Sequence, residues 1–406
     1  MSIKSLKYIA LFLVLFNDLL AVSQNIKSRC STGKLIEEAQ EKPEYIATQE
    51  KISEAIKNYK FDKTDTVITI PVVVHVLYKN QRENIYDDQI YSQIEVLNED
   101  FRKLNSDISS VPSQFSVADI KIEFCLAKTD PNGNYTPGIT RVPTTLDNIG
   151  INKTYYTVSP SWGNEYLNIW VCDFGNNVAG EATPPGTAPA DRDGVIVDYL
   201  NFGTIGTVEQ PYHLGRTVNH EVGHWLDLFH IWGKNNNNPN CSNDDEVADT
   251  PDQSAIHVGC PASRTTCGSL DMLTNYMGYV DDACMANFTE GQKTRMRAAL
   301  LSARSTVVNS DKGCNIVSVN NHSVNSSIAV FPNPIRNEFS VKLEKSISLN
   351  QTNVLLISSL GIEVPVQIQQ NSNIIQIIPP SNLKGIYFLR LYNQDITVIK
   401  KLIFNN

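Results

Sequence analysis

Residues 220–230 carry the motif that decides the fold and read His220-Glu221-Val222-Gly223-His224-Trp225-Leu226-Asp227-Leu228-Phe229-His230. On a helix, His220 and His224 lie one turn apart on the same face, so both imidazoles can reach one zinc ion. Glu221 projects beside them, placed to act on a water at the metal. His230 lies too far along a continuous helix to reach that ion. We therefore predict a sharp turn after Leu226 that brings His230 back.

The ligand set itself indicates chemistry. Three neutral histidines leave a fourth coordination position open, which is typical of catalytic rather than structural zinc sites. Bound zinc lowers the pKa of a coordinated water to about 7, so hydroxide is available at neutral pH. The chain has 7 His among 406 residues, so incidental surface histidines explain this spacing poorly. The motif predicts a catalytic zinc site with Glu221 as general base.

The composition places this motif in a large, acidic and globular chain. With 406 residues, 41% of them hydrophobic, the chain should form two or three domains, and a wholly disordered or fibrous protein is excluded. Its formal net charge is −9, and no long Lys/Arg cluster is present. We therefore expect no nucleic-acid partner.

The N-terminus, residues 1–23, has the pattern of a secretory signal peptide. Lys4 and Lys7 precede the apolar run of residues 9–16, and Ala21-Val22-Ser23 offers small residues to a signal peptidase. The alternative is a membrane anchor, but the run is too short to span a bilayer. We expect a secreted or cell-surface protein with no membrane span in its mature form, and export permits disulfides.

Four parts are expected after the signal peptide. Residues 24–62 are polar and helix-prone and cannot build a core alone, so we assign them as a propeptide. Residues 63–315 form the catalytic domain, residues 316–327 an Asn/Ser-rich linker, and residues 328–406 a C-terminal domain. In the catalytic domain we expect strands at 67–78, 120–126, 167–174 and 195–199 and helices at 87–104, 213–229 and 289–307.

The C-terminal domain consists of short strand-like runs separated by Asn, Gly and Pro. This pattern predicts a small all-β sandwich. Its expected strands are 338–343, 354–358, 364–368, 374–378, 386–392 and 397–404.

Residues 220–230 resemble the long zinc signature of the metzincin peptidases, and their surroundings resemble the pappalysin (cytophagalysin) family specifically. The resemblance implies an α+β metzincin-like domain with a twisted mixed sheet and an active-site helix. One departure is Asp227, which stands where the family has a turn glycine. Asp and Asn are the next-best residues for a left-handed conformation, so the turn remains possible.

Asn275-Tyr276-Met277-Gly278-Tyr279 is similar to the Met-turn of the same family. Taken alone, a methionine among aromatic residues would be ordinary core. By resemblance, Met277 forms an apolar floor under the zinc site. Tyr279 matches the tyrosine that stabilises the tetrahedral intermediate.

The stretch from Cys241 to Asp252 is rich in acidic residues. Clustered hard oxygen ligands in a loop suit calcium, although a solvated acidic loop is the alternative. In the resembling family a calcium site lies here. The matching positions are Asp245, Val247 through its carbonyl group, and Thr250, with Asp249 as a weaker candidate.

The chain has 8 cysteines, which at first invites full pairing. The resemblance implies the pairs Cys241–Cys267 and Cys260–Cys284, where sequence alone allows three connectivities. It also implies that Cys30 blocks the zinc in the latent form, as a cysteine switch; the alternative is a disulfide partner. The remaining cysteines, whose pairing the sequence leaves open, are Cys125, Cys172 and Cys314.

The C-terminal domain opens with Val330-Phe331-Pro332-Asn333-Pro334 and resembles the sorting domain of type IX secretion substrates of Gram-negative bacteria. This implies the bacterial secretion machinery as a partner. A carbohydrate- or matrix-binding sandwich is the alternative, but it would need an exposed aromatic platform.

The function that fits these features is a secreted zinc endopeptidase, made as a latent proenzyme and acting on protein or peptide substrates. Glu221 would take a proton from the attacking water and return it to the leaving amine. We expect the strand at 195–199 to be the edge that binds extended substrate. A non-catalytic, metal-containing adhesion protein is the alternative, supported by Asp227.

Cleavage specificity is less well defined by the sequence. Some relatives cleave before Arg or Lys through an acidic residue just before the last bridge cysteine. That position is Ala283 here, and specificity for basic residues is a hypothesis that depends on the nearby Asp281 and Asp282.

Overall fold

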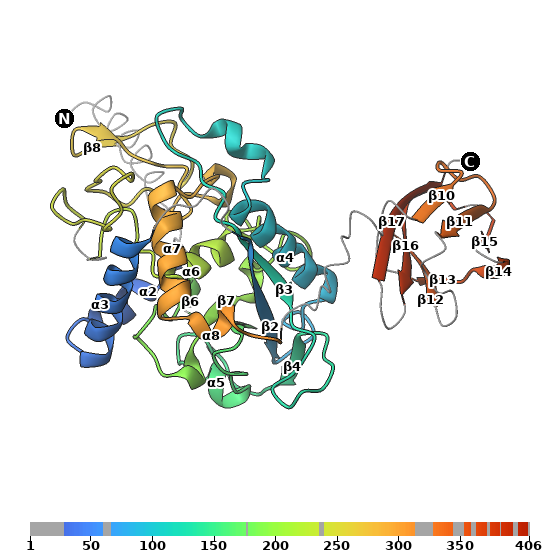
Figure 1. The fold of residues 1–406 in the computed structure, drawn as a ribbon, viewed down its shortest axis with the longest axis horizontal. Helices are drawn as coiled ribbons and strands as arrows, with labels where there is room; N and C mark the ends of the chain where they lie inside the picture. Colours follow the sequence, from blue (N-terminus) through green and yellow to red (C-terminus); the bar gives the residue numbers. More distant parts are fainter. Residues whose placement is uncertain are drawn as a thin grey trace, which may run out of the picture. The chain divides into compact units, whose positions relative to one another are not determined.

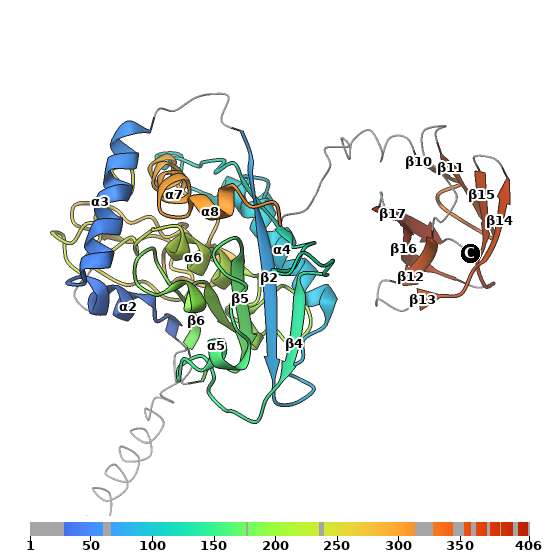
Figure 2. The same ribbon diagram turned by 60° about the horizontal axis from the view of Figure 1, so that its bottom comes forward.

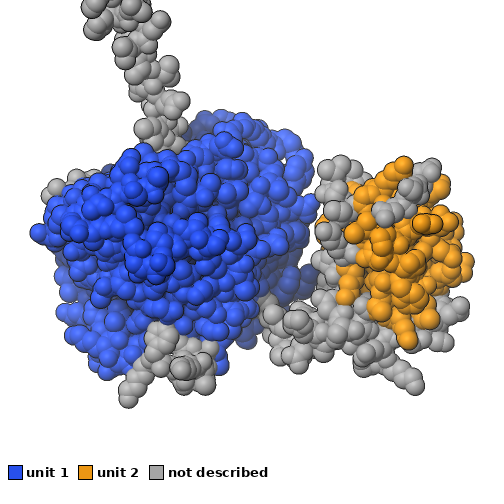
Figure 3. Space-filling model, turned by 90° about the horizontal axis from the view of Figure 1, so that it is seen from above, with its two compact units in different colours: residues 1–314 blue, residues 315–406 orange. Residues whose placement is uncertain are grey.

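The computed structural model describes residues 28–59, 66–175, 178–234, 239–312, 328–343, 353–358, 363–371, 374–381, 383–392 and 397–404. The chain divides into two compact units, residues 1–314 and 315–406 (Figure 3). The predicted signal peptide and linker lie outside the described residues. Among the described residues, no helix has the length and apolar character needed to cross a membrane.

The first unit is built on a seven-stranded mixed sheet (Figure 1). Its central strand, β2 (Ile68–Tyr78), is a run of β-branched residues that is buried along almost its whole length, as expected for a strand covered on both faces. β2 pairs in parallel with β5 (Leu167–Cys172) on one side and with β3 (Ile122–Leu126) and β4 (Ile139–Pro143) on the other.

The other half of the sheet continues through β7 (Val195–Asp198) and β6 (Val178–Ala182) to β1 (Ser28–Cys30). β6 is antiparallel to β7, and all other pairs of this sheet are parallel. The expectation that residues 195–199 form the substrate-binding edge is therefore wrong, because β7 lies between β5 and β6. The edge strand of the catalytic domain is β6, whose Val-Ala-Gly-Glu-Ala sequence lacks the β-branched run that marks the inner strands.

Three helices pack on one face of this sheet. They are α4 (Asp87–Phe101), α6 (Arg216–Trp225) and α7 (Glu290–Ser302), and their buried residues share one core with alternate residues of β2. α7 begins with a capping box between Thr289 and Gln292 and is followed by α8 (Ser305–Val308). The opposite face has its own apolar cluster around Trp170, covered in part by α5 (Tyr155–Val158). The remaining short elements are β8 (Thr265–Thr266), β9 (Ser269–Leu270) and 3₁₀ turns at Ser106–Ser110, Ala190–Arg192, Tyr199–Asn201 and Asp282–Cys284.

The N-terminal segment predicted as a propeptide has three elements. β1 joins the edge of the sheet, and the chain continues into α2 (Thr32–Ala39) and α3 (Pro43–Asn58), which lies beside α7 (Figure 2). Its apolar residues Ile36, Ala39 and Tyr45 cluster with Phe229 of the catalytic domain. The segment therefore has no separate core and is held by the domain it covers.

The second unit holds two four-stranded antiparallel sheets with one apolar core between them, in agreement with the predicted sandwich. One sheet has the order β10-β11-β15-β14 and the other β13-β12-β16-β17. Their bounds are β10 Ile328–Phe331, β11 Phe339–Leu343, β12 Asn353–Ser358, β13 Glu363–Val364, β14 Gln367–Asn371, β15 Ile374–Ile378, β16 Gly385–Tyr392 and β17 Thr397–Phe404. The single strand expected at 364–368 is two strands, β13 and β14.

Candidate metal centre

The helix α6 carries the first part of the zinc motif. It starts after Gly215 and ends at Trp225, shorter at both ends than the predicted 213–229. Asp227 then adopts a left-handed conformation with φ of 76°, and the amide of Leu228 donates to the carbonyl of Gly223. This is a helix-terminating turn of the kind that usually employs glycine. It reverses the chain and returns His230 to the histidines of the helix.

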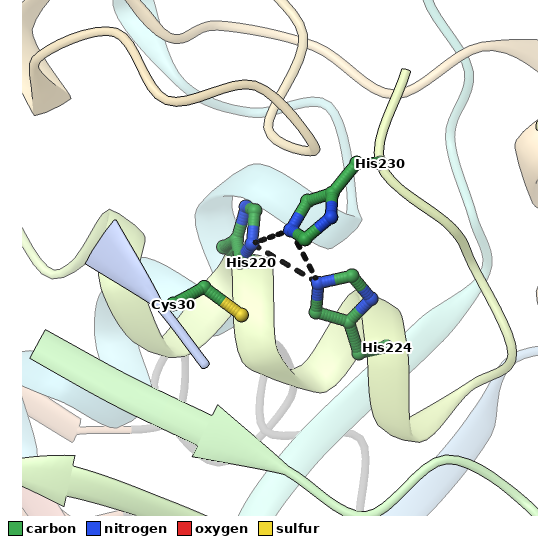
Figure 4. Close-up of side chains that lie close together, drawn as sticks. All are labelled: Cys30, His220, His224 and His230. Carbon is green, nitrogen blue, oxygen red and sulfur yellow. Dashed lines mark hydrogen bonds between the residues drawn. The ribbon is translucent and has the colours of Figure 1, made fainter. Parts of the chain in front are cut away.

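The three histidines converge on one point (Figure 4). The Nε2 atoms of His220, His224 and His230 lie 3.1–3.2 Å from one another, and all three side chains are buried. The Nδ1 atoms of His220 and His224 lie 2.7 Å from the carbonyl oxygens of Tyr276 and Leu228. A carbonyl only accepts, so each Nδ1 carries the proton and each Nε2 presents a lone pair.

Converging lone pairs fit a cation. Burial lowers the pKa of His220 and lowers that of His224 to about 4, so both rings are neutral at pH 7. Neutral Nε2 atoms aimed at one another repel unless a metal ion lies between them, and imidazole nitrogen is a preferred ligand of zinc. The Sγ of Cys30 joins the same group, in which the four ligand atoms lie within 4.8 Å of one another. The donor set of three nitrogens and one sulfur matches zinc.

Cys30 reaches this site from β1. Its Sγ lies 3.5 Å from Oε2 of Glu221, and burial, followed by the nearby Glu221 charge, raises the pKa of the thiol well above its ordinary value. Burial also raises the pKa of Glu221 to about 8, and the carboxylate accepts a hydrogen bond of 3.0 Å from Thr32. The hydroxyl of Tyr279 donates to the carbonyl oxygen of Cys30 at 2.9 Å. The N-terminal segment thus contacts every group expected to act on a substrate.

Met277 lies directly beneath the helix. A Cβ at Gly223 would come within 2.5 Å of the Met277 sulfur, so only glycine allows this approach. Met277 is fully buried, and the ring of Tyr279 packs edge-on against His230 and Trp232. Met277 therefore lies against the helix, and Tyr279 lies against the ring of His230.

Asp227 does more than permit the turn. Its carboxylate is buried and lies 2.7 Å from the guanidinium of Arg295 on α7, and it accepts a hydrogen bond of 2.6 Å from Gln49 on α3. Arg295 also donates to the Asp227 carbonyl and pairs with Glu246 at 2.9 Å. The substitution of the family's glycine therefore leaves the ligand geometry intact, and the argument for a non-catalytic protein loses its main support.

A buried ion pair beside the metal centre was not predicted from the sequence. The side chain of Arg29 is fully buried there, where its Nη2 lies 2.5 Å from Oδ1 of Asp282 and its guanidinium stacks on the Tyr212 ring at 4.3 Å. Asp282 also accepts the amide of Leu214 at 2.8 Å, before the start of α6. Ala283 is exposed, so the acidic residue that binds a guanidinium here is Asp282, two residues before Cys284.

The acidic loop brings part of the predicted calcium ligands together. The hydroxyl of Thr250 lies 2.8 and 2.9 Å from the carboxylate oxygens of Asp245 and 2.6 Å from the carbonyl of Val247. Burial raises the pKa of Asp245 to about 8. Asp249 lies apart from this group, because its carboxylate accepts from Thr289 and from the amide of Gly291 at the start of α7.

The cysteines near the site form the pairs Cys241–Cys267 and Cys260–Cys284, the two that the resemblance implies. Cys125 is disulfide-bonded, whereas Cys172 is a buried thiol. Cys314 lies outside the described residues. Cys241–Cys267 closes the loop between His230 and the Met-turn, and Cys260–Cys284 joins that loop to the residues that follow the Met-turn.

Comparison with known sequences agrees with this site. A family profile described as pregnancy-associated plasma protein-A matches residues 156–301, and a profile described as a secretion system C-terminal sorting domain matches residues 329–405. An extracellular metalloprotease of Arthroderma benhamiae is 32% identical over 234 residues, which is 56% of this chain and 76% of that protein.

Solved structures show the same similarity. A promirolysin mutant of Tannerella forsythia is 39% identical, with a TM-score of 0.62, over 68% of this chain and 96% of the other. Mature mirolysin in complex with a cleaved peptide is 43% identical, with a TM-score of 0.57, over 60% of this chain and 97% of the other.

Proposed function

Because the chain belongs to the pappalysin family of zinc metallopeptidases, we propose that His220, His224 and His230 hold a catalytic zinc ion. Glu221 acts beside this ion as the general base in the hydrolysis of peptide bonds. The protein is an extracellular metalloprotease with a C-terminal sorting domain, made as a latent proenzyme. The observation that carries the proposal is the convergence of three buried Nε2 atoms beside a carboxylate, two of them on neutral rings.

Each catalytic group has one task in this proposal. Zinc, when bound, supplies a Lewis acid that activates water and polarises the carbonyl group to be attacked. Glu221 accepts a proton from the attacking water and returns it to the leaving amine. The Tyr279 hydroxyl, which holds the carbonyl oxygen of Cys30 in the proenzyme, donates instead to the oxygen of the substrate carbonyl as negative charge develops there. Met277 supports the helix from below.

Latency follows from the position of residues 28–59 of the predicted propeptide. Cys30 occupies the open side of the histidine triad, while β1 pairs with the same edge strand that an extended substrate would need. The chain must therefore lose this segment, by cleavage between it and the catalytic domain, before substrate can enter.

The Arg29–Asp282 ion pair supports a preference for basic residues. A buried carboxylate that binds a guanidinium in the proenzyme will bind the same group of a substrate after the segment has left. We therefore propose that Asp282 selects Arg or Lys next to the cleaved bond.

We also propose that a calcium ion binds in the acidic loop. The Asp245 carboxylate is buried, the Thr250 hydroxyl lies 2.9 Å from it, and the Val247 carbonyl lies 2.6 Å from that hydroxyl. Such an oxygen cluster suits calcium. Thr250 and Asp245 are its core ligands, and Asp249 serves as a helix cap instead.

Export is assigned to the two ends of the chain. The sorting domain at residues 329–405 points to secretion machinery as the partner. We propose that residues 1–23, which lie outside the described residues, are a signal peptide that directs the chain across the cytoplasmic membrane.

The decisive experiment compares zinc content with turnover. Glu221→Ala in the processed enzyme should keep one zinc ion per chain, by elemental analysis, and lose about 100- to 10,000-fold of its activity on a denatured protein. His224→Ala should lose both metal and activity. Full activity of the Glu221→Ala enzyme would overturn the mechanism.

A further inference from the structure

The edge strand β6 carries a carboxylate that the mechanism leaves unused. The side chain of Glu181 is only 5% exposed, although β6 forms the edge of the catalytic domain's sheet next to β1. Its Oε2 accepts a hydrogen bond of 2.7 Å from the Ser31 hydroxyl of the N-terminal segment. Its Oε1 lies 3.4 Å from the ammonium group of Lys153.

The register places Glu181 beside the reacting centre. Cys30 pairs with Gly180, whose missing side chain leaves room for Glu221: a Cβ there would lie 3.0 Å from the Glu221 side chain. Ser31, one residue after Cys30, therefore faces Glu181, the residue after Gly180. On the other side of Cys30, Arg29 pairs with Asp282. The metal-facing residue is thus flanked by two positions, and each is bound by its own carboxylate.

We propose that Glu181 is a second specificity-determining residue, which favours substrates with a hydrogen-bond-donating side chain, Arg, Lys, Ser or Thr, at the position held by Ser31 and excludes Asp and Glu there. This position lies across the cleaved bond from the residue that Asp282 selects. The inference rests on the proposed function, because it names part of the substrate of the same site.

Loss of the N-terminal segment creates the need for such a partner. When Ser31 leaves, Oε2 of Glu181 loses the side-chain donor that it has in the proenzyme, and a donor from the substrate restores that bond. An acidic side chain would instead face the Glu181 carboxylate, with that of Glu221 packed against the neighbouring Gly180.

Lys153 moderates this selection. Its ammonium group neutralises one side of Glu181, yet the Lys153 side chain is 42% exposed and lies on the loop before α5. Removing this charge should make the position more negative and strengthen the preference for a cationic side chain. Lys153 therefore provides a variant whose effect has the opposite sign to that of Glu181.

The test uses the processed, zinc-loaded enzyme and a peptide series. A library digest analysed by mass spectrometry first defines the best-cleaved sequence and its cleaved bond. Peptides are then made with Arg, Ser, Ala or Glu on the side of that bond away from the Asp282-selected residue. We expect kcat/KM to fall about tenfold from Arg or Ser to Ala and further to Glu. Glu181→Gln should reduce the difference between Arg and Glu at least tenfold, and Lys153→Met should enlarge it.

Binding gives a readout independent of turnover. In the Glu221→Ala background, the affinity of the Arg and Glu peptides should show the same order, and Glu181→Gln should again narrow the difference. Equal preference in the wild-type and Glu181→Gln enzymes, with normal cleavage of the Ala peptide by both, would overturn the role of Glu181 while leaving the protease intact. Absence of cleavage of every peptide by zinc-loaded wild-type enzyme would instead overturn the proposed function.

Discussion

The side-chain amide of Gln49 donates a hydrogen bond of 2.6 Å to the carboxylate of Asp227, and its oxygen lies 3.4 Å from the Arg295 guanidinium. Gln49 belongs to helix α3 of the N-terminal segment, residues 28–59, which we call the latency segment. Asp227 belongs to the turn that positions His230. The residue that replaces the family's glycine is therefore a point of attachment for this segment, away from the metal ligands.

Gln49→Glu should loosen the latency segment. It places a carboxylate against buried Asp227, and like charges at this distance repel. We expect the purified proenzyme to be activated severalfold faster by a trace of added protease. Ser53→Glu, which adds the same negative charge at an exposed position of α3, is the control and should leave the activation rate unchanged. Equal rates for both variants would contradict an anchoring role for Gln49.

Asp227→Gly and Asp227→Asn separate backbone conformation from charge. Both residues tolerate the positive φ, but only the carboxylate pairs with buried Arg295. We expect Asp227→Gly to bind zinc normally and to lose about 1–3 kcal/mol of stability, because Arg295 keeps only Glu246 as its ionic partner. Denaturant unfolding of the proenzyme measures the change. Loss of zinc by Asp227→Gly would show that the carboxylate, and not the turn, positions His230.

Cys30→Ala should raise the activity of the unprocessed protein about tenfold, equivalent to only about 1.4 kcal/mol of lost inhibition. Full activity is not expected, because Arg29 and α3 still hold the segment. Arg29→Ala in the same chain should release more. Cys172→Ala, which removes the other buried thiol, serves as the control for loss of a cysteine. Unchanged latency in the Cys30→Ala protein would argue against its position over the zinc.

Asp282→Asn should abolish the preference for basic residues without abolishing cleavage. Asn keeps an acceptor for the amide of Leu214 but loses the charge that binds Arg29. In a peptide-library digest, cleavage next to Arg should drop at least about tenfold relative to cleavage next to Leu. Asp281→Asn, one residue earlier, is the matched control. Retained Arg preference in the Asp282→Asn enzyme would assign this preference to another acid.

His75 should make the fold acid-sensitive. It is buried in β2, stacks on Trp170 and contacts Asn168 at 3.2 Å, and burial lowers its pKa to about 4. Below its unfolded pKa of about 6.5, the unfolded chain binds a proton that the folded chain does not, so stability falls as pH drops towards 4. The loss reaches up to about 3 kcal/mol at pH 4.

Melting temperatures between pH 7 and 5 measure this effect. His75→Asn should flatten the decline seen in the wild-type protein, even if its stability at pH 7 is lower. His213→Asn, which removes a less buried histidine, should leave the decline unchanged. A variant at His75 that declines as steeply as the wild type would assign the acid sensitivity to other groups.

The sequence predicted those parts of the structure that follow from periodicity and ligand spacing. The strand β2 and the helices α4 and α6 stand within a few residues of their predicted ranges, because buried runs and apolar faces leave a local pattern. β6 leaves none, since its small residues serve close packing near Glu221 rather than a hydrophobic face. Its position at the edge is a property of the whole sheet.

The same limit applies to the metal centre. His220, His224 and His230 could be assigned because their spacing encodes the geometry directly. The Arg29–Asp282 pair could not, since 253 residues separate the partners and neither belongs to a motif with ligand spacing. Arg29 does stand next to Cys30 in the sequence. That position predicts a contact with Asp282 only when the β1–β6 register is known.

The pairing of β1 with β6 constrains how this enzyme can evolve. Residues 28–31 serve as an internal imitation of a substrate, with Arg29 and Ser31 matching the two carboxylates that flank the metal centre. A mutation that changes either carboxylate to suit a new substrate sequence also weakens the binding of the N-terminal segment that blocks the site. Changes in substrate specificity therefore have to be accompanied by changes in residues 29 and 31. Otherwise the proenzyme loses latency and is active before it is processed.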